Sequence, residues 1–480
     1  MTLILYNTLS RREEPFTPLI PGIVSMYCCG ITVYDYCHLG HARTCVVWDV
    51  VRRYLEYLGY KVRYIQNFTD IDDKILNRAK NEHTTMAAVA ERFIQAYFED
   101  MAKLGVRPAD AYPRATHTLD GIKRLVYELE QKGYAYPSDG DVYYSVRRFS
   151  DYGKLSGRKL DDLQAGASGR VETDDPEAIK KQDPFDFALW KGAKPGEPSW
   201  DSPWGQGRPG WHIECSAMVK EQLGETIDIH VGGSDLIFPH HENEIAQSEA
   251  ATGKPLAHYW LHNGMVKVAG EKMSKSLGNF ITIRELLAKY DPLAVRLLIL
   301  GAQYRKPIDF SDEGLQAATN GWHTLQEGLS FGYKHLQQDN PGITDQELEN
   351  RFQEAVNHDF NFAGGLAVLF EIAKELRKEG NNLTHAGKTD SNLAQLAVKW
   401  HTLVKLSRVL GLEMAADQGE TPVSEGISAA DIENLIQQRT EAKKAKNYAE
   451  SDRIRAELKA QGISLIDQPG GVTKWLREGD

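Results

Sequence analysis

Hydrophobic positions in the first seventy residues predict a strand, a helix and a second strand. Residues 22–28 form a short apolar run of β-favouring side chains, which is typical of a buried strand. Apolar residues then recur at helical spacing over 42–58, and Gly59 stands where a helix commonly ends. Strand character resumes over 61–66. This order predicts the first βαβ unit of a nucleotide-binding parallel sheet.

The pattern further along the chain predicts an interrupted sheet followed by helices. Residues 84–104 and 120–133 have helical spacing, 134–155 show short aromatic alternations with turns, and 161–204 are rich in turn formers. Beyond residue 291 the spacing is mainly helical, residues 418–428 form a polar linker, and a helical stretch over 431–461 precedes a small β element. We therefore expect an α/β protein whose Rossmann-type parallel-sheet domain is split by an insertion and followed by a helical bundle and a small C-terminal α+β domain. The predicted boundaries are 1–119 and 206–300 for the two halves of the sheet domain, 120–205 for the connective insertion, 301–417 for the bundle and 429–480 for the last domain.

Composition narrows the class of protein. Hydrophobic residues make up 41% and charged residues 26%, as in ordinary soluble globular proteins. No apolar run approaches the roughly twenty residues that span a bilayer, so we expect neither a membrane segment nor a signal peptide. Four of the five cysteines crowd into positions 28–45, which is not a disulfide framework. Reduced cysteines in the cytoplasm, some of them metal ligands, fit this pattern.

The net charge of −11 argues against a general nucleic-acid binder, but one segment is basic. Residues 439–459 carry seven basic side chains against four acidic ones, a local charge of +3. Lys443, Lys444 and Arg453 in this segment are candidate RNA contacts, and a solvated helix with internal ion pairs is the equal alternative. Trp475 beyond it is expected to be exposed, where it would either pack locally or stack on an unpaired base.

Two short motifs suggest phosphate binding. His38, Gly40 and His41 lie in the sequence HLGH where the first helix begins, so backbone N–H groups, the helix dipole and two imidazoles can face an anion. A capping or core role for the histidines is the simpler reading of four residues alone. The second motif, KMSKS, places Lys272 and Lys275 on a segment rich in small residues, where lysines act as mobile charges.

Four residues in three distant segments form a candidate metal site. Cys29 lies at the end of the first strand, Cys215 follows residues 211–214 (WHIE), and His240 and Glu244 are four apart on a helix that we expect to start at Pro239. Two thiolates, an imidazole and a carboxylate suit zinc. Taken alone, Cys215 is more readily a small buried hydrophobe than a metal ligand. Only one of Cys28 and Cys29 can face the site, because successive strand residues point to opposite sides.

The end of another predicted strand offers a ribose site. Gly232 and Gly233 follow an apolar run and permit close backbone approach, and Asp235 can accept hydrogen bonds from hydroxyl groups. The aspartates of NFTDIDDK (67–74) lack the spacing of a calcium loop, so we expect part of them to cap a helix.

These motifs together resemble known enzymes. HLGH and KMSKS are similar to the paired signatures of class I aminoacyl-tRNA synthetases, with Leu39 where that class usually has isoleucine. Further segments resemble the cysteinyl-tRNA synthetase family and occur in the family's order. They are CCGITVYDYCHLGH (28–41), NFTDIDDK (67–74), FDFALWK (185–191), GRPGWHIECSAM (207–218) and DLIFPHHENEIAQSE (235–249).

The resemblance implies an activity and roles for individual residues. The chain would activate L-cysteine with ATP to cysteinyl-adenylate and transfer the acyl group to the 3′ end of the cysteine tRNA. It implies one Zn²⁺ per chain, which would bind the substrate thiol and select against serine, and Mg²⁺ with ATP. It also picks Cys29 over Cys28. The implied roles are phosphate and catalytic contacts for His38, His41, Lys272 and Lys275, nucleotide contacts for Gly40, Gly232, Gly233 and Asp235, zinc ligation for Cys29, Cys215, His240 and Glu244, and cysteine contacts for Cys29, Thr69, Trp211 and His230.

Two other functions remain open at the level of sequence. A cysteine ligase of the same catalytic fold that acts on an amino sugar would share these motifs, although it would not need the tail over 431–475. An inactive RNA-binding module is the second alternative, and the intact HLGH and KMSKS residues argue against it. The expected partners are the cysteine tRNA, ATP and cysteine, with no membrane and no obligate protein partner. The small insertion leaves little room for a separate editing domain.

Overall fold

A computed structural model gives the fold of the chain in two units. It describes residues 2–162, 179–268, 270–272, 280–336, 342–414, 429–445, 447–467 and 473–477. The first unit comprises Met1–Arg377 and Leu393–Glu413, and the second comprises Lys378–Asn392 and Met414–Asp480. Among the described residues, no helix has the length and apolar character needed to cross a membrane.

A four-stranded parallel sheet forms the centre of the first unit. Its strands lie in the order β10-β9-β3-β4, and every neighbouring pair is parallel. The predicted strand–helix–strand opening is confirmed, since helix α1 links β3 to β4. The bounds are β3 (Ile23–Thr32), α1 (Leu39–Tyr57), β4 (Lys61–Thr69), β9 (Ile227–Gly233) and β10 (Ala257–Asn263).

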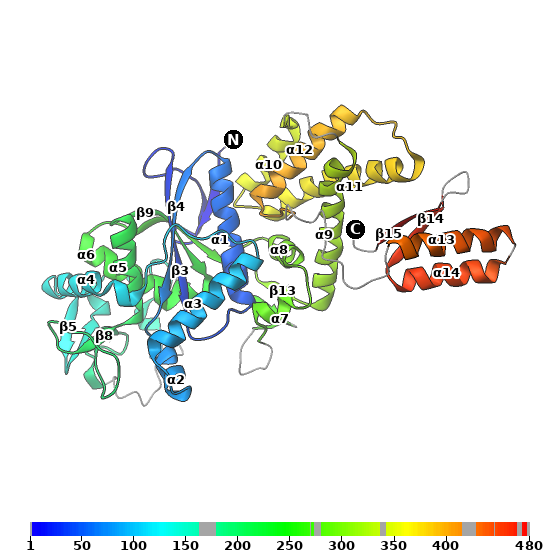
Figure 1. The fold of residues 1–480 in the computed structure, drawn as a ribbon. Coiled ribbons are helices and arrows are strands. Elements are labelled where there is room, and N and C mark those ends of the chain that lie inside the picture. Colours follow the sequence, from blue (N-terminus) through cyan, green and yellow to red (C-terminus); the bar gives the residue numbers. More distant parts are fainter. Residues whose placement is uncertain are drawn as a thin grey trace. The chain divides into compact units, whose positions relative to one another are not determined.

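Helices cover both faces of this sheet (Figure 1). Helices α1 and α8 (Pro292–Leu300) lie on one side of it, and α5 (Trp211–Leu223) and α6 (Glu242–Thr252) lie on the other. Because the strands are parallel, their carboxyl ends meet at one edge, where ligands bind in open α/β sheets. Helices α2 (Asp73–Asn81) and α3 (Met86–Lys103) follow β4, and Asp72 caps α2 by accepting the Lys74 N–H at 2.8 Å.

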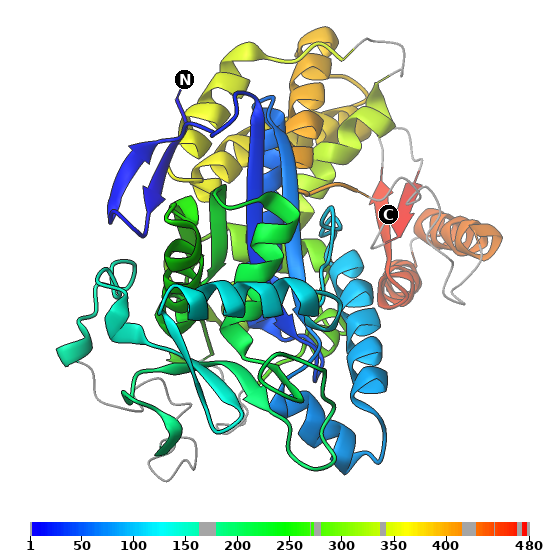
Figure 2. The ribbon, with the colours of Figure 1, turned by 90° about the vertical axis from the view of Figure 1, so that its left-hand side faces the viewer.

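The insertion forms an antiparallel sheet beside the parallel-sheet domain (Figure 2). The turn-rich interpretation of 161–204 was wrong for one segment, because Phe187–Gly192 is a strand that pairs with the predicted hairpin. The side chains of Leu125, Val142 and Trp190 pack in one cluster with Ala217 of α5 and Ala246 of α6, so this sheet has no core separate from those helices. The elements are α4 (Leu119–Gln131), β5 (Ala135–Ser138), β6 (Asp141–Tyr144), β7 (Phe187–Gly192) and β8 (Gly207–Pro209).

The remaining elements of the first unit are a small sheet, a hairpin and helices. Strand β11 pairs with β12 and β13, while β1 pairs with β2. The elements are β1 (Ile4–Asn7), β2 (Arg12–Pro15), β11 (Val266–Val268), β12 (Glu271–Lys272), α7 (Ile283–Leu287), β13 (Ile308–Phe310), α9 (Asp312–His335), α10 (Gln346–Asn357), α11 (Phe362–Ala386, which continues into the second unit) and α12 (Leu393–Val409).

The second unit holds two helices and a hairpin at its C-terminal end. The helical prediction for 431–461 is confirmed, but the segment forms two helices, because the chain turns near Asn447, whose side chain caps the second helix by accepting the Glu450 N–H. The elements are α13 (Ala429–Lys444), α14 (Tyr448–Ala460), β14 (Ile463–Asp467) and β15 (Thr473–Arg477), and the two strands pair antiparallel.

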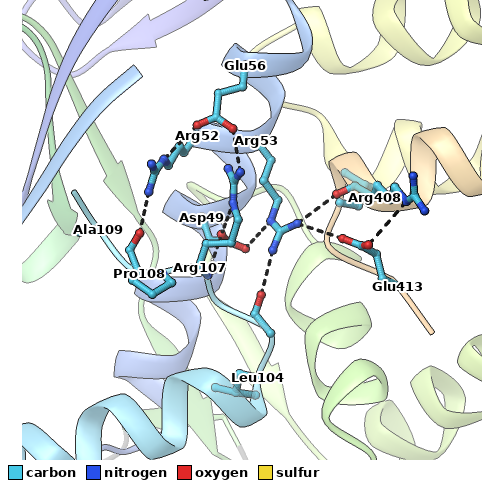
Figure 3. Close-up of polar contacts among 12 residues, drawn as sticks. Asp49, Arg52, Arg53, Glu56, Leu104, Arg107, Pro108, Ala109, Arg408 and Glu413 are labelled. Atoms are coloured by element: carbon cyan, nitrogen blue, oxygen red, sulfur yellow. Dashed lines mark hydrogen bonds and ion pairs between the residues drawn. The ribbon is translucent and has the colours of Figure 1, made fainter. Parts of the chain in front are cut away.

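A buried charge network joins α1 to the ends of two other helices (Figure 3). Asp49 of α1 pairs with Arg53, Arg107 and Arg296. Arg53 also donates to the carbonyl oxygens of Gly105 and Arg408, which lie at the C-terminal ends of α3 and α12. Guanidinium groups thus satisfy helix-end carbonyls that lack partners within their own helices.

Candidate active site and metal centre

A cavity of about 270 Å³ opens at the carboxyl ends of the strands. The HLGH loop, Gly233 at the end of β9 and residues 263–266 at the end of β10 and beyond it all contribute to its wall. The residues that line it are Cys29, Gly30, Ile31, His38, Gly40, His41, Thr44, Cys45, Gln66, Gly233, Asp235, Leu236, Asn263, Gly264, Met265 and Val266.

His38 and His41 begin α1 and stack on each other, with ring centroids 3.7 Å apart. His38 is the N-cap residue, and its Nδ1 accepts the N–H of Gly40 at 3.0 Å. His41 Nδ1 accepts the N–H of His38 at 3.3 Å. Burial, with His38 nearby, lowers the pKa of His41 well below its usual value, so this ring is neutral near pH 7. The structure thus combines the capping role with a position on the cavity wall.

The two glycines at the end of β9 lie close to neighbouring side chains. A Cβ on Gly232 would lie 2.8 Å from the His241 ring, and one on Gly233 would lie 2.5 Å from Asp235 Oδ1. Asp235 follows in the helical turn Ser234–Leu236 and lines the cavity. The structure therefore brings these predicted nucleotide residues together with the HLGH loop.

Of the two signature lysines, Lys272 lies within the residues that the structure describes. Lys272 ends β12, where it pairs with Lys267 of β11. Lys275 lies outside the described residues.

The predicted metal ligands converge beside the cavity. The ligand atoms of Cys29, Cys215, His240 and Glu244 all lie within 4.8 Å of one another, and all four residues are buried. Cys29 Sγ is 3.4 Å from His240 Nε2 and 3.1 Å from Glu244 Oε1. His240 Nε2 is 2.9 Å from the same Glu244 oxygen. Two sulfurs, one nitrogen and one oxygen around a common point fit a zinc ion in number and chemistry.

The helix that carries two of these ligands begins later than expected. Helix α6 starts at Glu242, and His240 lies in the helical turn Ile237–His241 that precedes it, rather than in a helix that starts at Pro239. The predicted i, i+4 relation between His240 and Glu244 nevertheless holds.

Charges within the cluster favour metal binding. Burial opposes ionisation of Glu244, but His230 and His240 outweigh it and hold the pKa of that carboxyl well below its usual value. A hydrogen bond from Cys29 lowers the pKa of Cys215 to about 6. Burial, together with Cys215 and Glu244, raises the pKa of Cys29. The cluster therefore holds a carboxylate and one easily formed thiolate, which are the charged ligands that a divalent cation needs.

A glycine beside the cluster lets the end of β3 approach β4 closely, and only Cys29 of the two adjacent cysteines belongs to the cluster. Strand β3 shifts register against β4 between Cys28 and Ile31. A Cβ on Gly30 would lie 1.6 Å from the Asn67 carbonyl oxygen, so only glycine allows this approach. Cys28 Sγ contacts the Cys29 carbonyl oxygen at 3.5 Å, away from the ligand atoms.

Neighbouring rings fix the orientation of the ligands. The Nδ1 atoms of His240 and His212 are 2.9 Å apart, so His240 Nδ1–H can donate a hydrogen bond to His212 Nδ1. With its proton on Nδ1, His240 has an unprotonated Nε2 that is free to bind a metal. Trp211 stacks on His240 with centroids 4.0 Å apart. His230 Nε2 lies 2.9 Å from Glu244 Oε2, the oxygen that does not face Cys29. The structure thus places two predicted cysteine-binding residues against the metal ligands.

Thr69 meets a carboxyl group that was not predicted from the sequence. Its hydroxyl donates to Glu214 Oε2 at 3.1 Å. Burial, with Cys215 adjacent, raises the pKa of Glu214 well above its usual value. Asn67 was also missed, although its Oδ1 accepts the Gly30 N–H at 2.8 Å and lies 3.7 Å from Cys215 Sγ. In the sequence, the only sign that Glu214 and Asn67 belong to the site is that they lie close to Cys215 and Thr69.

The predicted RNA contacts lie in the second unit. Lys443 and Lys444 are exposed at the end of α13. Arg453 of α14 is paired with Glu450 at 2.7 Å and Glu457 at 2.8 Å, as the alternative of a helix with internal ion pairs requires. The prediction of an exposed Trp475 was wrong, because this side chain is half-buried and packs against a small apolar core that includes Ile454 and Leu465.

Comparison with known proteins identifies the fold and the family. A family model for the tRNA synthetases class I (C) catalytic domain matches residues 15–320, and a DALR domain model matches residues 351–415. The structure resembles Mycobacterium tuberculosis methionyl-tRNA synthetase in complex with methionyl-adenylate, with a TM-score of 0.56 and 18% identity over 81% of this chain and 90% of that one. At this identity the likeness establishes the fold alone.

Two curated relatives are similar over their whole length. The cysteine–tRNA ligase of Microcystis aeruginosa is 99% identical over 480 residues, which cover all of both chains. The cysteine–tRNA ligase of Gloeothece citriformis is 72% identical over 485 residues, which cover 99% of this chain and all of the relative. The chain therefore belongs to the cysteine–tRNA ligase family, with a catalytic domain of the class I tRNA synthetase type.

Proposed function

We propose that this protein activates L-cysteine with ATP and transfers the cysteinyl group to the 3′ end of the cysteine tRNA. The observation that carries the proposal is the position of a buried cluster of two cysteines, a histidine and a glutamate beside a cavity lined by the HLGH histidines. One site can then hold the amino acid while the other holds the nucleotide. The full-length relatives of the same family support this assignment.

Adenylation is an attack of the cysteine carboxylate on the α-phosphate, so the residues of the chain act by positioning and by stabilising charge. His38 and His41 lie at the positive end of α1, where their rings and nearby N–H groups can hold the phosphates. Lys275, assisted by Lys272, would neutralise the departing pyrophosphate, and Mg²⁺ would bind together with ATP. Gly232 and Gly233 allow the ribose to approach, and Asp235 would accept its hydroxyl groups.

Cys29, Cys215, His240 and Glu244 would hold one zinc ion, and the buried donor set fits that ion. When bound, zinc supplies a coordination position that a thiolate fills far more readily than a hydroxyl group. Trp211, His230 and Thr69 surround the ligands and would shape the cysteine pocket. Shape alone discriminates such similar substrates by only about 1–3 kcal/mol. Selection of sulfur therefore gives a reason why cysteine is distinguished from serine without a separate editing core.

Lys443, Lys444, Arg453 and Trp475 would lie near the bound tRNA, and the match to a DALR domain supports a helical region that serves the same partner. Five free cysteines, all buried, are compatible with a reducing compartment, and we place the enzyme in the cytoplasm.

Two measurements test the proposal. Charging of total tRNA with each of the twenty amino acids should yield cysteinyl-tRNA alone, and charging with another amino acid would contradict the assignment. Spectra of a cobalt-substituted protein should shift when cysteine is added and stay unchanged with serine. If cysteine leaves the spectrum unchanged, the metal is structural and the account of selectivity fails.

A further inference from the structure

The end of β10 and the residues that follow it form part of the cavity wall, which includes the buried amide of Asn263. Asn263 is the last residue of β10 and lies level with Gly233 of β9 in the parallel sheet. Asn263, Gly264 and Met265 line the same cavity as His38 and Asp235. Asn263 therefore lines the cavity together with the end of β9 and the start of α1.

This part of the wall is held in place from two sides. The N–H of Gly264 donates to the Tyr304 carbonyl oxygen at 2.8 Å, and a Cβ on Gly264 would lie 2.4 Å from the Lys306 carbonyl oxygen. Arg43 of α1 is fully buried and donates to the carbonyl oxygens of Met265 at 2.8 Å and Tyr304 at 3.0 Å. Because Arg43 follows His41 by two residues on the same helix, the wall and the HLGH loop form one rigid frame.

Asn263 has an acceptor atom that nothing in the described structure satisfies. The residue is only 3% exposed. Its Nδ2 donates to the Gly264 carbonyl oxygen at 3.3 Å, which fixes the orientation of the amide, since the swapped orientation would set two acceptors against each other. Oδ1 then has no hydrogen-bond partner among the residues described. A buried acceptor without a donor is unfavourable, and a bound ligand that supplies the donor removes this cost.

We propose that Asn263 Oδ1 recognises the nucleoside of ATP by accepting a hydrogen bond from it, which makes Asn263 a specificity-determining residue. The inference rests on the proposed function, because it takes this cavity as the ATP site. Asp235 lies at the end of the neighbouring strand and is the proposed acceptor for the ribose. The adenine 6-amino group is then the donor that remains. Guanine and hypoxanthine carry an oxygen at that position, so they would place two acceptors in contact and bind poorly.

The test compares ATP analogues in cysteine-dependent pyrophosphate exchange. Purine riboside triphosphate lacks the 6-amino group, while 2′-deoxy-ATP and 3′-deoxy-ATP each lack one ribose hydroxyl. With the native enzyme, purine riboside triphosphate should have a KM roughly 2- to 10-fold above that of ATP, the effect of one neutral hydrogen bond. In Asn263→Ala the KM for ATP should rise by a similar factor, and the difference between these two nucleotides should vanish, while the KM for cysteine is unchanged.

The analogues also distinguish the possible donors. If the penalty that vanishes in Asn263→Ala is that of a deoxy analogue, Oδ1 recognises the nucleoside through the ribose. If every penalty persists in Asn263→Ala, the proposal is overturned. The native enzyme gives a test that does not depend on folding of a variant, because equal KM values for ATP and all three analogues would also overturn it. Exchange with ATP itself establishes the proposed function separately, so failure of one does not imply failure of the other.

Discussion

Asp49 of α1 and Arg296 of α8 form an ion pair that is closed to solvent, with side chains 1% and 0% exposed. Burial opposes ionisation of Asp49, but Arg296 and Arg53 outweigh it and lower the pKa of that carboxyl. Arg296 also donates to the carbonyl oxygens of Leu410 and Leu104 at 2.8 and 3.2 Å. A single guanidinium thus connects the helix that bears the HLGH histidines with the ends of α3 and α12.

Loss of this guanidinium should destabilise the first unit. Arg296→Met leaves Asp49 with fewer charge partners in a buried position, which costs about 3–5 kcal/mol when one member of a buried pair is removed. Denaturant unfolding of the full chain measures the change in free energy. The control is Arg12→Met, because Arg12 pairs with Glu14 on the surface and is 75% exposed, so its loss should cost below about 1 kcal/mol. Equal losses of unfolding free energy in the two variants would show that the buried ion pair does not stabilise the first unit.

Neighbouring cysteines provide a matched test of the zinc site. Cys29→Ala removes a predicted ligand and should lower zinc affinity by roughly 100-fold or more, since loss of supporting residues alone costs 10- to 100-fold. Cys28→Ala removes a sulfur that contacts the Cys29 carbonyl oxygen, and it should retain about one zinc per chain. Metal analysis after dialysis against a weak chelator measures both. Zinc loss from Cys28→Ala with retention in Cys29→Ala would reverse the assignment.

The basic residues of the second unit should contribute unequally to tRNA binding. Lys444→Ala should raise the KM for tRNA and reduce the salt dependence of binding by about one unit of slope, as expected for one phosphate contact. Arg453→Ala should have a smaller effect, because two glutamates already neutralise that guanidinium. Binding titrations at several salt concentrations measure both slopes, and adenylation rates provide the control. Unchanged slopes in both variants would show that Lys444 and Arg453 do not contact the tRNA.

A buried histidine should make stability depend on pH. His262 lies 2.8 Å from Thr8 Oγ1 and from His241, and burial, with His230 nearby, lowers its pKa to about 3. The unfolded chain takes up this proton near pH 6.5, whereas the folded chain does not, so stability is complete above about pH 6.5 and falls by about 1.4 kcal/mol per pH unit below it.

The effect can be isolated with a variant. His262→Asn should show a shallower loss of unfolding free energy between pH 6.5 and 5 than the native chain, with zinc present in excess in both series. Parallel curves for the two proteins would mean that His262 does not remain neutral in the fold.

Local patterns predicted the sheet well because its strands and helices are defined by side chains close in sequence. The apolar spacing after HLGH and the following glycine placed α1 and β4 within a few residues of their observed bounds. Strand β7 was missed because its partners lie across the insertion, so nothing in the local sequence indicates its pairing. The turn at Asn447 was missed because charged residues continue at helical spacing through it.

The site was predicted through resemblance more than through local chemistry. Nothing within the sequence around Cys215 indicates that its sulfur meets Cys29 and His240, since these contacts depend on the crossing of α5 and β3. Glu214 and Asn263 were missed for a related reason. Their significance comes from burial and from partners, which one sequence does not reveal. The structure likewise decided between exposure and packing for Trp475.

The spacing of the metal ligands along the chain has a consequence for synthesis. Cys29 and Glu244 are separated by 215 residues (244 − 29), so the cluster cannot close until the ribosome has made most of the first unit. At about 5–20 residues per second, the thiol of Cys29 waits roughly 10 to 40 s for its last partner. During that interval a nascent cysteine is open to oxidation and to stray metal ions, and the growing polypeptide depends on the cell to keep it reduced.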